Sequence, residues 1–147
     1  MGFDQRKRLS HRVPSWVPDT PVFFITINCS PRGVNQLADS GVFGSIVGAL
    51  ETYKSQSKCF THLLLVMPDH LHVLLSVNLQ RCTLGQLIGS TKRYLANHRN
   101  IKWQKNFFDH RIRSDGEFEE KAHYVLMNPV RAGLVDAVEE WPYWSRV

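Results

Sequence analysis

The sequence contains few cysteines and no long apolar run. Its 147 residues include three cysteines, Cys29, Cys59 and Cys82, and none of them has the Cys-x-x-Cys spacing of zinc sites and redox motifs. An odd number of widely spaced cysteines indicates free thiols in a reducing compartment. No apolar run reaches the roughly 18 residues that a membrane span needs, and Pro14 and Pro18 interrupt the segment where a signal peptide has its apolar stretch. These absences predict a soluble intracellular protein.

Internal repeats, low-complexity segments and a Walker-type phosphate-binding loop are also missing. Apolar residues make up 43% of the chain and charged residues 21%, which excludes a largely disordered or collagen-like chain. The length is sufficient for one domain with its own core. The net charge of +5 favours polyanionic partners, although it is too small to identify one.

The order of the predicted elements favours an α+β fold. Strands are expected at residues 22–29, 60–67 and 70–77, helices at residues 37–57, 83–97 and 117–127, and a short strand or ordered loop at residues 103–113. This order is typical of a ferredoxin-like sandwich, an antiparallel sheet with helices mainly on one face. We expect this single domain at residues 21–147. A basic N-terminal arm at residues 1–20 precedes it, with the cations Arg6, Lys7, Arg8 and Arg12.

Two histidines lie two residues apart at the start of the third predicted strand. Side chains alternate along a strand, so His70 and His72 share one face while Leu71 and Val73 point to the apolar other face. Paired imidazoles can bind one transition-metal ion, or Mg²⁺ or Mn²⁺ when oxygen ligands complete the shell. The alternative is a pair of solvated histidines on an open sheet face. Two imidazoles are too few ligands, so a metal site requires further residues from elsewhere in the chain.

Tyr124 and Asn128 stand one helical turn apart in the last predicted helix. A phenol oxygen is a competent nucleophile, and an amide oxygen is a suitable ligand for a hard cation. Tyr124 could equally be an aromatic residue at the edge of the core, and Asn128 could be a helix C-cap before Pro129. The spacing alone leaves both alternatives open.

Three blocks of the chain together resemble the single-tyrosine HUH transposases. They are residues 68–75 (Pro-Asp-His-Leu-His-Val-Leu-Leu), the basic and aromatic residues 103–113, and residues 123–135, which contain Asn-Pro-Val-Arg-Ala-Gly-Leu-Val. Within this class the resemblance is to the REP-associated tyrosine transposases and other insertion-sequence 200-like transposases. It extends over most of the chain, and residues 128–135 are its most distinctive part.

The resemblance implies a metal-dependent enzyme that cleaves and rejoins single-stranded DNA at hairpin, REP-like elements. Tyr124 matches the catalytic tyrosine, which would attack a phosphodiester to form a 5′-phosphotyrosine link and a free 3′-hydroxyl. His70, His72 and Asn128 match the metal ligands, and the cofactor would be a divalent ion, Mg²⁺ or Mn²⁺. Residues 21–147 would then form a HUH transposase-like catalytic domain. The protein would act in the cytoplasm, associated with the nucleoid through DNA.

Residues 92–113 are the most basic part of the chain. They contain seven basic residues against one acidic residue, a local net charge of +6. Aromatic residues stand between the cations, and such a combination suits single-stranded DNA. The predicted DNA-binding residues are Lys92, Arg93, Arg99, Lys102, Lys105, Arg111, Arg113 and Trp103. The alternative is that the aromatic residues belong to the core and the cations cover a solvated helix face.

Two other functions are compatible with these residues. One is a catalytically silent module that binds hairpin DNA, and the other is a metal-dependent phosphoesterase that uses His70 and His72 with water as the nucleophile. The resemblance also leaves open a homodimer, in which Tyr124 would act in its own subunit or in its partner.

Overall fold

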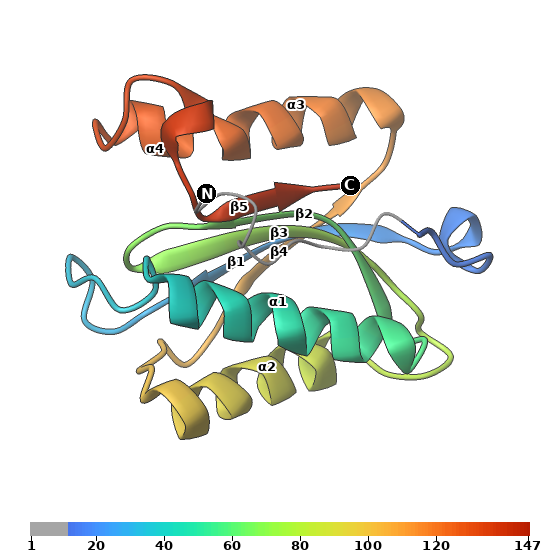
Figure 1. Cartoon of the computed structure of the whole chain (residues 1–147). Coiled ribbons are helices and arrows are strands. Elements are labelled where there is room, and N and C mark those ends of the chain that lie inside the picture. Colours follow the sequence, from blue (N-terminus) through green and yellow to red (C-terminus); the bar gives the residue numbers. More distant parts are fainter. Residues whose placement is uncertain (1–11) are drawn as a thin grey trace.

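The computed structural model describes residues 12–147, which contain one antiparallel sheet with helices on both of its faces (Figure 1). The strands are β1 (Val22–Asn28), β2 (Cys59–Val66), β3 (His70–Val77), β4 (Phe108–Ile112) and β5 (Trp144–Arg146), paired in the order β4-β1-β3-β2-β5. The helices are α1 (Ser40–Ser55), α2 (Leu84–Arg99), α3 (Asp115–Leu126) and α4 (Asn128–Arg131). The order β1-α1-β2-β3-α2-β4 is ferredoxin-like. The predicted α+β class with an antiparallel sheet is confirmed.

The central strands β2 and β3 form the hairpin that the sequence predicts. The chain turns at Pro68 and Asp69, where the Met67 N–H donates to the His70 carbonyl at 2.8 Å. Both strands are almost wholly buried, because helices cover both faces of the sheet at its centre. Such strands have nearly continuous apolar runs, as these two do.

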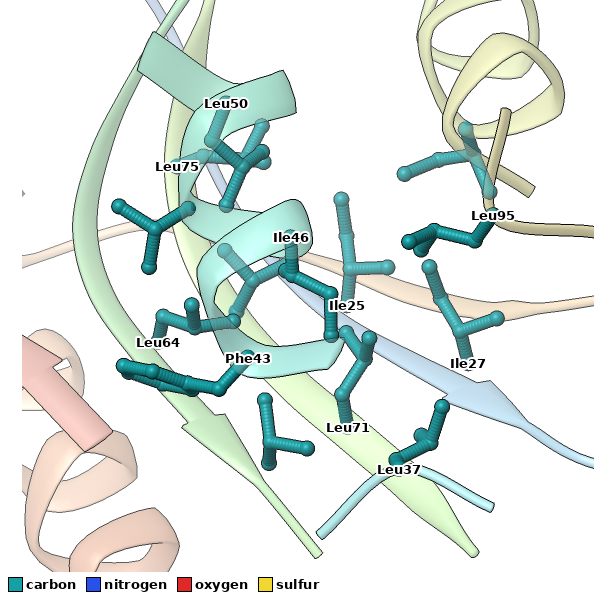
Figure 2. Packing of buried hydrophobic residues seen from close by; sticks show 14 of the residues in the cluster. Ile25, Ile27, Leu37, Phe43, Ile46, Leu50, Leu64, Leu71, Leu75 and Leu95 are labelled. Carbon is teal, nitrogen blue, oxygen red and sulfur yellow. The ribbon is translucent and has the colours of Figure 1, made fainter. Parts of the chain in front are cut away.

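Helices α1 and α2 cover one face of the sheet. The Asp39 side chain caps α1 by accepting from the Val42 N–H, and Thr83 caps α2 in a capping box with Gln86. Figure 2 shows the core beneath them, with Phe43, Ile46 and Leu50 of α1 and Leu95 of α2 packed against Ile25, Ile27, Leu64, Leu71 and Leu75 of the sheet.

Helix α3 lies across the opposite face, which we call the α3 face (Figure 1). Its buried residues Ala122 and Val125 pack with Phe24, Leu63, Leu65, Met67 and Leu74. The Trp141 indole closes one side of this smaller core by donating to the Val66 carbonyl at 3.0 Å. Two of the three long helices thus share one face, and the third lies on the face that carries the paired histidines.

Two segments differ from their predicted bounds for identifiable reasons. Helix α1 begins at Ser40 and not near Leu37, because the N–H groups of Gln36 and Leu37 donate to the Pro68 carbonyl and hold this segment against the hairpin turn. Residues 103–113, which were predicted to form a short strand or an ordered loop, contain both a loop and a strand. Residues 108–112 form the edge strand β4, and Trp103 makes only an isolated bridge with Cys29.

Outside the sandwich, Val17–Asp19 form a short 3₁₀ helix in which Val17 is buried. Of the cations expected in the N-terminal arm, Arg6, Lys7 and Arg8 lie outside the described residues. The three cysteines are free thiols, as predicted. No helix within residues 12–147 has the length and apolar character that a membrane crossing requires.

Candidate active site

The two imidazoles of His70 and His72, here called the imidazole pair, lie together on the α3 face at the start of β3. Their ring centroids are 5.0 Å apart, and His72 is only 7% exposed. The register of β3 against β1 places His72 opposite Thr26 and His70 opposite Asn28. The alternation predicted from the sequence therefore holds, and both rings occupy the face opposite to Leu71 and Val73.

A hydrogen bond to Nδ1 orients His70. Its Nδ1–H donates to Asp69 Oδ1 at 2.8 Å, which leaves the Nε2 lone pair unprotonated and directed into the site. Asp69 accepts in turn from Arg32 Nε at 2.9 Å and from the Gly33 N–H at 2.8 Å. Burial raises the pKa of the Asp69 carboxyl, but the hydrogen bonds from Arg32, His70 and Gly33 outweigh it and hold that pKa well below its usual range. A carboxylate behind an imidazole is the usual outer-shell support of a metal ligand.

His72 is held in a similar way on the inner side of the site. Its Nδ1 lies 2.9 Å from the Thr26 hydroxyl of the neighbouring strand, so its Nε2 also faces the site. Burial lowers the pKa of His72 to about 3, and electrostatic interactions with His70, Arg131 and Arg32 act in the same direction. The ring is therefore neutral at neutral pH, which is the form that binds metals.

Asn128 brings its carboxamide to the imidazole pair. Its Nδ2 lies 3.2 Å from His70 Nε2 and 3.0 Å from His72 Nε2. The chain delivers it by a break between helices, since α3 ends at Leu126 and α4 begins at Asn128 with Pro129 in its first turn. The amide oxygen and nitrogen exchange places when the amide group turns by 180°. The same side chain can therefore present an oxygen at the point where the two imidazole nitrogens meet.

These three side chains fit a divalent cation. Two neutral imidazole nitrogens and one amide oxygen are an acceptable partial ligand set for a borderline ion or for Mn²⁺, and phosphate oxygens or water would complete it. Among residues 12–147 there is no group of three or more His, Cys, Asp and Glu side chains suited to a metal. A metal at this place therefore depends on the amide of Asn128 as its third protein ligand.

Tyr124 lies one turn before Asn128, near the end of α3. Its side chain is 53% exposed, although most aromatic residues of the described chain are half-buried or buried. The Arg131 guanidinium stacks 4.2 Å from the centre of the Tyr124 ring, and its Nη2–H donates to the Tyr124 carbonyl at 2.7 Å. The phenol is thus held by its ring and remains open to a substrate, which is the condition a nucleophile needs.

The loop of the predicted DNA-binding segment borders the imidazole pair. The Gln104 N–H donates to the Asn28 carbonyl, and Asn28 is the strand partner of His70. Lys102 and Lys105 are exposed in this loop. Trp103 is half-buried, packs against the core of the other face and donates its Nε1–H to the Lys92 carbonyl at 3.0 Å.

The other predicted DNA-binding residues belong to helix α2 and to the edge strand β4 with the residue that follows it. Lys92 donates its ammonium to the carbonyls of Gln104 and Lys105 at 2.7 and 3.1 Å, so it holds the loop. Arg93 and Arg99 belong to α2, on the opposite side of the sheet, and Arg99 Nε donates to Ser45 Oγ of α1. Arg111 and Arg113 lie in and after the edge strand β4. The eight residues therefore come from helix α2, from the loop that follows it and from the region of the edge strand β4.

Sequence reasoning missed three residues that organise the site. Asp69 directly precedes His70, and this adjacency was an available signal for an orienting carboxylate. Thr26 and Arg32 carried no such signal. Thr26 contacts His72 only because β1 pairs with β3, and Arg32 reaches Asp69 only because the loop after β1 folds over the hairpin turn.

A ferredoxin-like sheet that carries two imidazoles, faced by a helix with tyrosine and asparagine, is the arrangement that the resemblance to HUH transposases implies. No family model matches the chain. Among curated proteins, the chain is 28% identical over 96 residues to a predicted REP-associated tyrosine transposase of Haemophilus influenzae, and the match covers 54% of this chain and 54% of that protein. It is 26% identical over 80 residues to the REP-associated tyrosine transposase of Escherichia coli, which is 53% of this chain and 48% of that protein. The chain thus spans about half the length of these curated relatives.

A solved structure supports the fold. The chain is similar to a REP-associated tyrosine transposase bound to a REP hairpin, with a TM-score of 0.73 and 21% identity over 92% of this chain and 82% of that one. Sequence and fold together relate the chain to the REP-associated tyrosine transposases, and the resemblance inferred from its motifs is confirmed.

Proposed function

We propose that this protein is a metal-dependent transposase-type nuclease that cleaves and rejoins single-stranded DNA through Tyr124. The observation that carries the proposal is the meeting of the Asn128 amide with both Nε2 atoms of the imidazole pair. Packing alone does not require two imidazoles to direct unprotonated nitrogens at one point. The relation to tyrosine transposases supports the same conclusion.

His70, His72 and Asn128 are the residues that would hold a divalent ion, Mg²⁺ or Mn²⁺. When bound, such an ion neutralises the charge of a phosphodiester and stabilises the leaving oxygen. Asp69 and Thr26 keep the two imidazoles in the orientation that this requires.

Tyr124 supplies the nucleophile. A new bond forms between its phenol oxygen and the phosphorus while the bond from phosphorus to the 3′-oxygen breaks. The phenol loses its proton and the leaving oxygen gains one, which leaves a 5′-phosphotyrosine and a 3′-hydroxyl. Attack by a 3′-hydroxyl on the phosphotyrosine reverses the step and joins the strands, so no nucleotide cofactor is needed because the bond energy is retained.

The proposed substrate is single-stranded DNA next to a hairpin. The solved relative is described as bound to a REP hairpin, and Lys102 and Lys105 are exposed cations of the loop whose backbone bonds to Asn28, the strand partner of His70. Such cations would bind the phosphates of the strand. Such a substrate implies that the protein acts on DNA in the cytoplasm. Because Asn128 reaches the imidazoles of its own chain, we also propose that one chain supplies all three metal ligands, whether or not it dimerises.

Covalent trapping tests the proposal. The protein is incubated with Mg²⁺ or Mn²⁺ and end-labelled hairpin DNA, and the products are separated on a denaturing gel. We expect a labelled protein band that is absent for Tyr124→Phe. Tyr94→Phe is the matched control, because it removes a phenol oxygen from α2 on the opposite face, and it should retain the band.

The other outcomes identify the competing functions. Cleavage that survives in Tyr124→Phe would show a phosphoesterase that uses water. Binding of the hairpin without cleavage under either metal would show a silent binding module. Either result overturns the proposal of a nuclease that cleaves DNA through Tyr124.

A further inference from the structure

Phe108 is an exposed aromatic residue that the candidate site does not use. Its side chain is 55% exposed, and it lies on the edge strand β4. Within residues 12–147, Phe108 and Tyr124 are the only exposed members of the Phe, Tyr and Trp residues. Large apolar side chains on an edge strand favour aggregation, so proteins usually place polar residues there. An exposed phenylalanine at this position therefore requires an explanation.

The strand register places Phe108 on the same face as the imidazole pair. Phe108 pairs with Thr26 of β1, and Thr26 pairs with His72 of β3. Directly paired residues point to the same side of a sheet. Phe108, Thr26 and His72 thus form one row across the α3 face, from the open edge of the sheet to the buried imidazole.

A series of ring contacts joins the two ends of this row. The Phe108 ring packs edge-on against Phe24, with centroids 6.1 Å apart, and Phe24 stacks on His72 at 5.4 Å with an angle of 23° between the rings. Phe24 and His72 are buried, so Phe108 is the member of the series with a free face. The rigid rings behind it fix its orientation, and a pre-oriented ring binds a planar ligand at low entropic cost.

Positive charge lies close to this row. Lys121 of α3 places its Nζ 5.4 Å from the centre of the Phe24 ring, the middle member of the series. An aromatic face beside a cation suits a nucleotide, whose base stacks while its phosphate is neutralised. The other aromatic residues of the same segment, Trp103 and Phe107, pack against the core of the opposite face and offer no such surface.

The geometry points to Phe108 as a stacking site for an unpaired DNA base of the strand whose phosphate lies at the imidazole pair. The inference rests on the proposed DNA substrate and adds a subsite to it. A base inside a continuous duplex is covered on both faces by its neighbours, so the ring selects an unpaired or terminal base. Phe108 would then help to place the strand for cleavage at the site.

Fluorescence anisotropy with labelled DNA hairpins that carry a single-stranded 5′ arm tests this inference. Phe108→Ala should weaken binding by about 5- to 100-fold, the effect of one base–aromatic stack, and Phe108→Tyr should restore it. Leu79→Ala is the matched control, because Leu79 is 56% exposed and lies beyond β3 at the end of the strand opposite to His70. Binding of a blunt duplex should be the same for the wild type and Phe108→Ala.

A scan of abasic positions along the arm identifies the base. At one position, loss of the base should weaken binding to the wild type but not binding to Phe108→Ala, since the partner is already gone. If Phe108→Ala binds the hairpins as tightly as the wild type, or if every abasic position affects both proteins equally, the inference is wrong. These measurements use Tyr124→Phe as the background and need no cleavage, so failure of the nuclease proposal is seen separately in the trapping experiment.

Discussion

At the scale of single residues, the partners of Nδ1 determine what the imidazole pair presents to a ligand. Asp69 and Thr26 engage the Nδ1 atoms, and the two Nε2 atoms consequently meet at the Asn128 amide. Each ring has a hydrogen-bond partner at Nδ1, which is Asp69 for His70 and Thr26 for His72. These partners distinguish the pair from histidines on a solvated sheet face.

Alanine at His70 or His72 should abolish cleavage and leave most of the DNA affinity intact. The cations that would bind phosphate lie outside the pair, whereas the Nε2 atoms would be metal ligands. Mn²⁺ binding, followed by electron paramagnetic resonance, should fall by about tenfold or more. His123→Ala, an exposed change on α3, is the control and should bind Mn²⁺ normally. Equal losses of DNA affinity and cleavage would contradict the assignment.

Arg131 should act as a positioning residue for Tyr124. It stacks on the ring and binds the carbonyl of the same residue, so Arg131→Leu frees the phenol to adopt other rotamers. We expect the single-turnover rate of phosphotyrosine formation to fall by about two- to fivefold, the effect of a cation–π contact of 0.5–1 kcal/mol. Arg131→Lys should recover part of the rate. Arg93→Leu on α2 is the control, and an unchanged rate in Arg131→Leu would refute the role.

At the scale of the elements, the Lys92 ammonium connects helix α2 to the loop that follows it. Lys92 donates to two loop carbonyls, and Trp103 donates back to the Lys92 carbonyl. Burial lowers the pKa of Lys92, as expected for an ammonium enclosed by backbone. The charge pattern assigns Lys92 to DNA binding, but its hydrogen bonds show that it holds the loop.

Replacing Lys92 by methionine should lower the stability of the protein. Two carbonyls lose their donor, and each lost hydrogen bond costs about 1 kcal/mol. Urea unfolding measures the effect, which should be about 1–2 kcal/mol. Arg93→Met is the matched control on the same helix and should change stability by less than about 0.5 kcal/mol, since Arg93 is exposed. Equal stabilities of the two variants would show that Lys92 does not hold the loop.

At the scale of the whole molecule, the α3 face contains a half-buried histidine, His62, that links stability to pH. His62 Nε2 lies 2.8 Å from the Ser76 hydroxyl, and the rings of Phe60 and Phe118 pack edge-on against it. Burial lowers its pKa to about 4 from an ordinary value of 6.5. Two cations flank these rings: the Lys54 ammonium lies 5.2 Å from the centre of the Phe60 ring, and the Arg146 guanidinium lies 6.0 Å from the centre of the Phe118 ring.

This histidine should make the protein less stable in mild acid. Between pH 6.5 and about 4 the unfolded chain takes up a proton on His62 that the folded chain does not, so stability is full above pH 6.5 and falls as the pH drops towards 4. His62→Gln removes this contribution and should flatten the pH dependence of urea unfolding over that range. His123→Gln, at an exposed position, should leave the slope unchanged. An identical slope for wild type and His62→Gln would show that His62 titrates normally.

The site was only partly predictable, and the reason differs from residue to residue. That His70 and His72 share a face follows from the alternation of any strand, and Thr83 as a helix cap follows from its local hydrogen bond with Gln86. The contact of Asn128 with the pair required α3 to cross the face opposite to α1. The spacing of Tyr124 and Asn128 was visible in the chain, but the sheet beneath them was not.

The sequence by itself determined most of the helices and strands, their order and the face of β3 that carries the histidines. These depend on backbone sterics and on apolar periodicity within a few residues. Only the tertiary structure decided that Thr26 supports His72, that Lys92 holds a loop and that Phe108 remains exposed in line with the imidazole pair. The hydrogen bonds among these contacts join residues 12 and 46 positions apart in the chain. They form only when strands that are not adjacent in the sequence pair in one register and each helix packs on one face of the sheet.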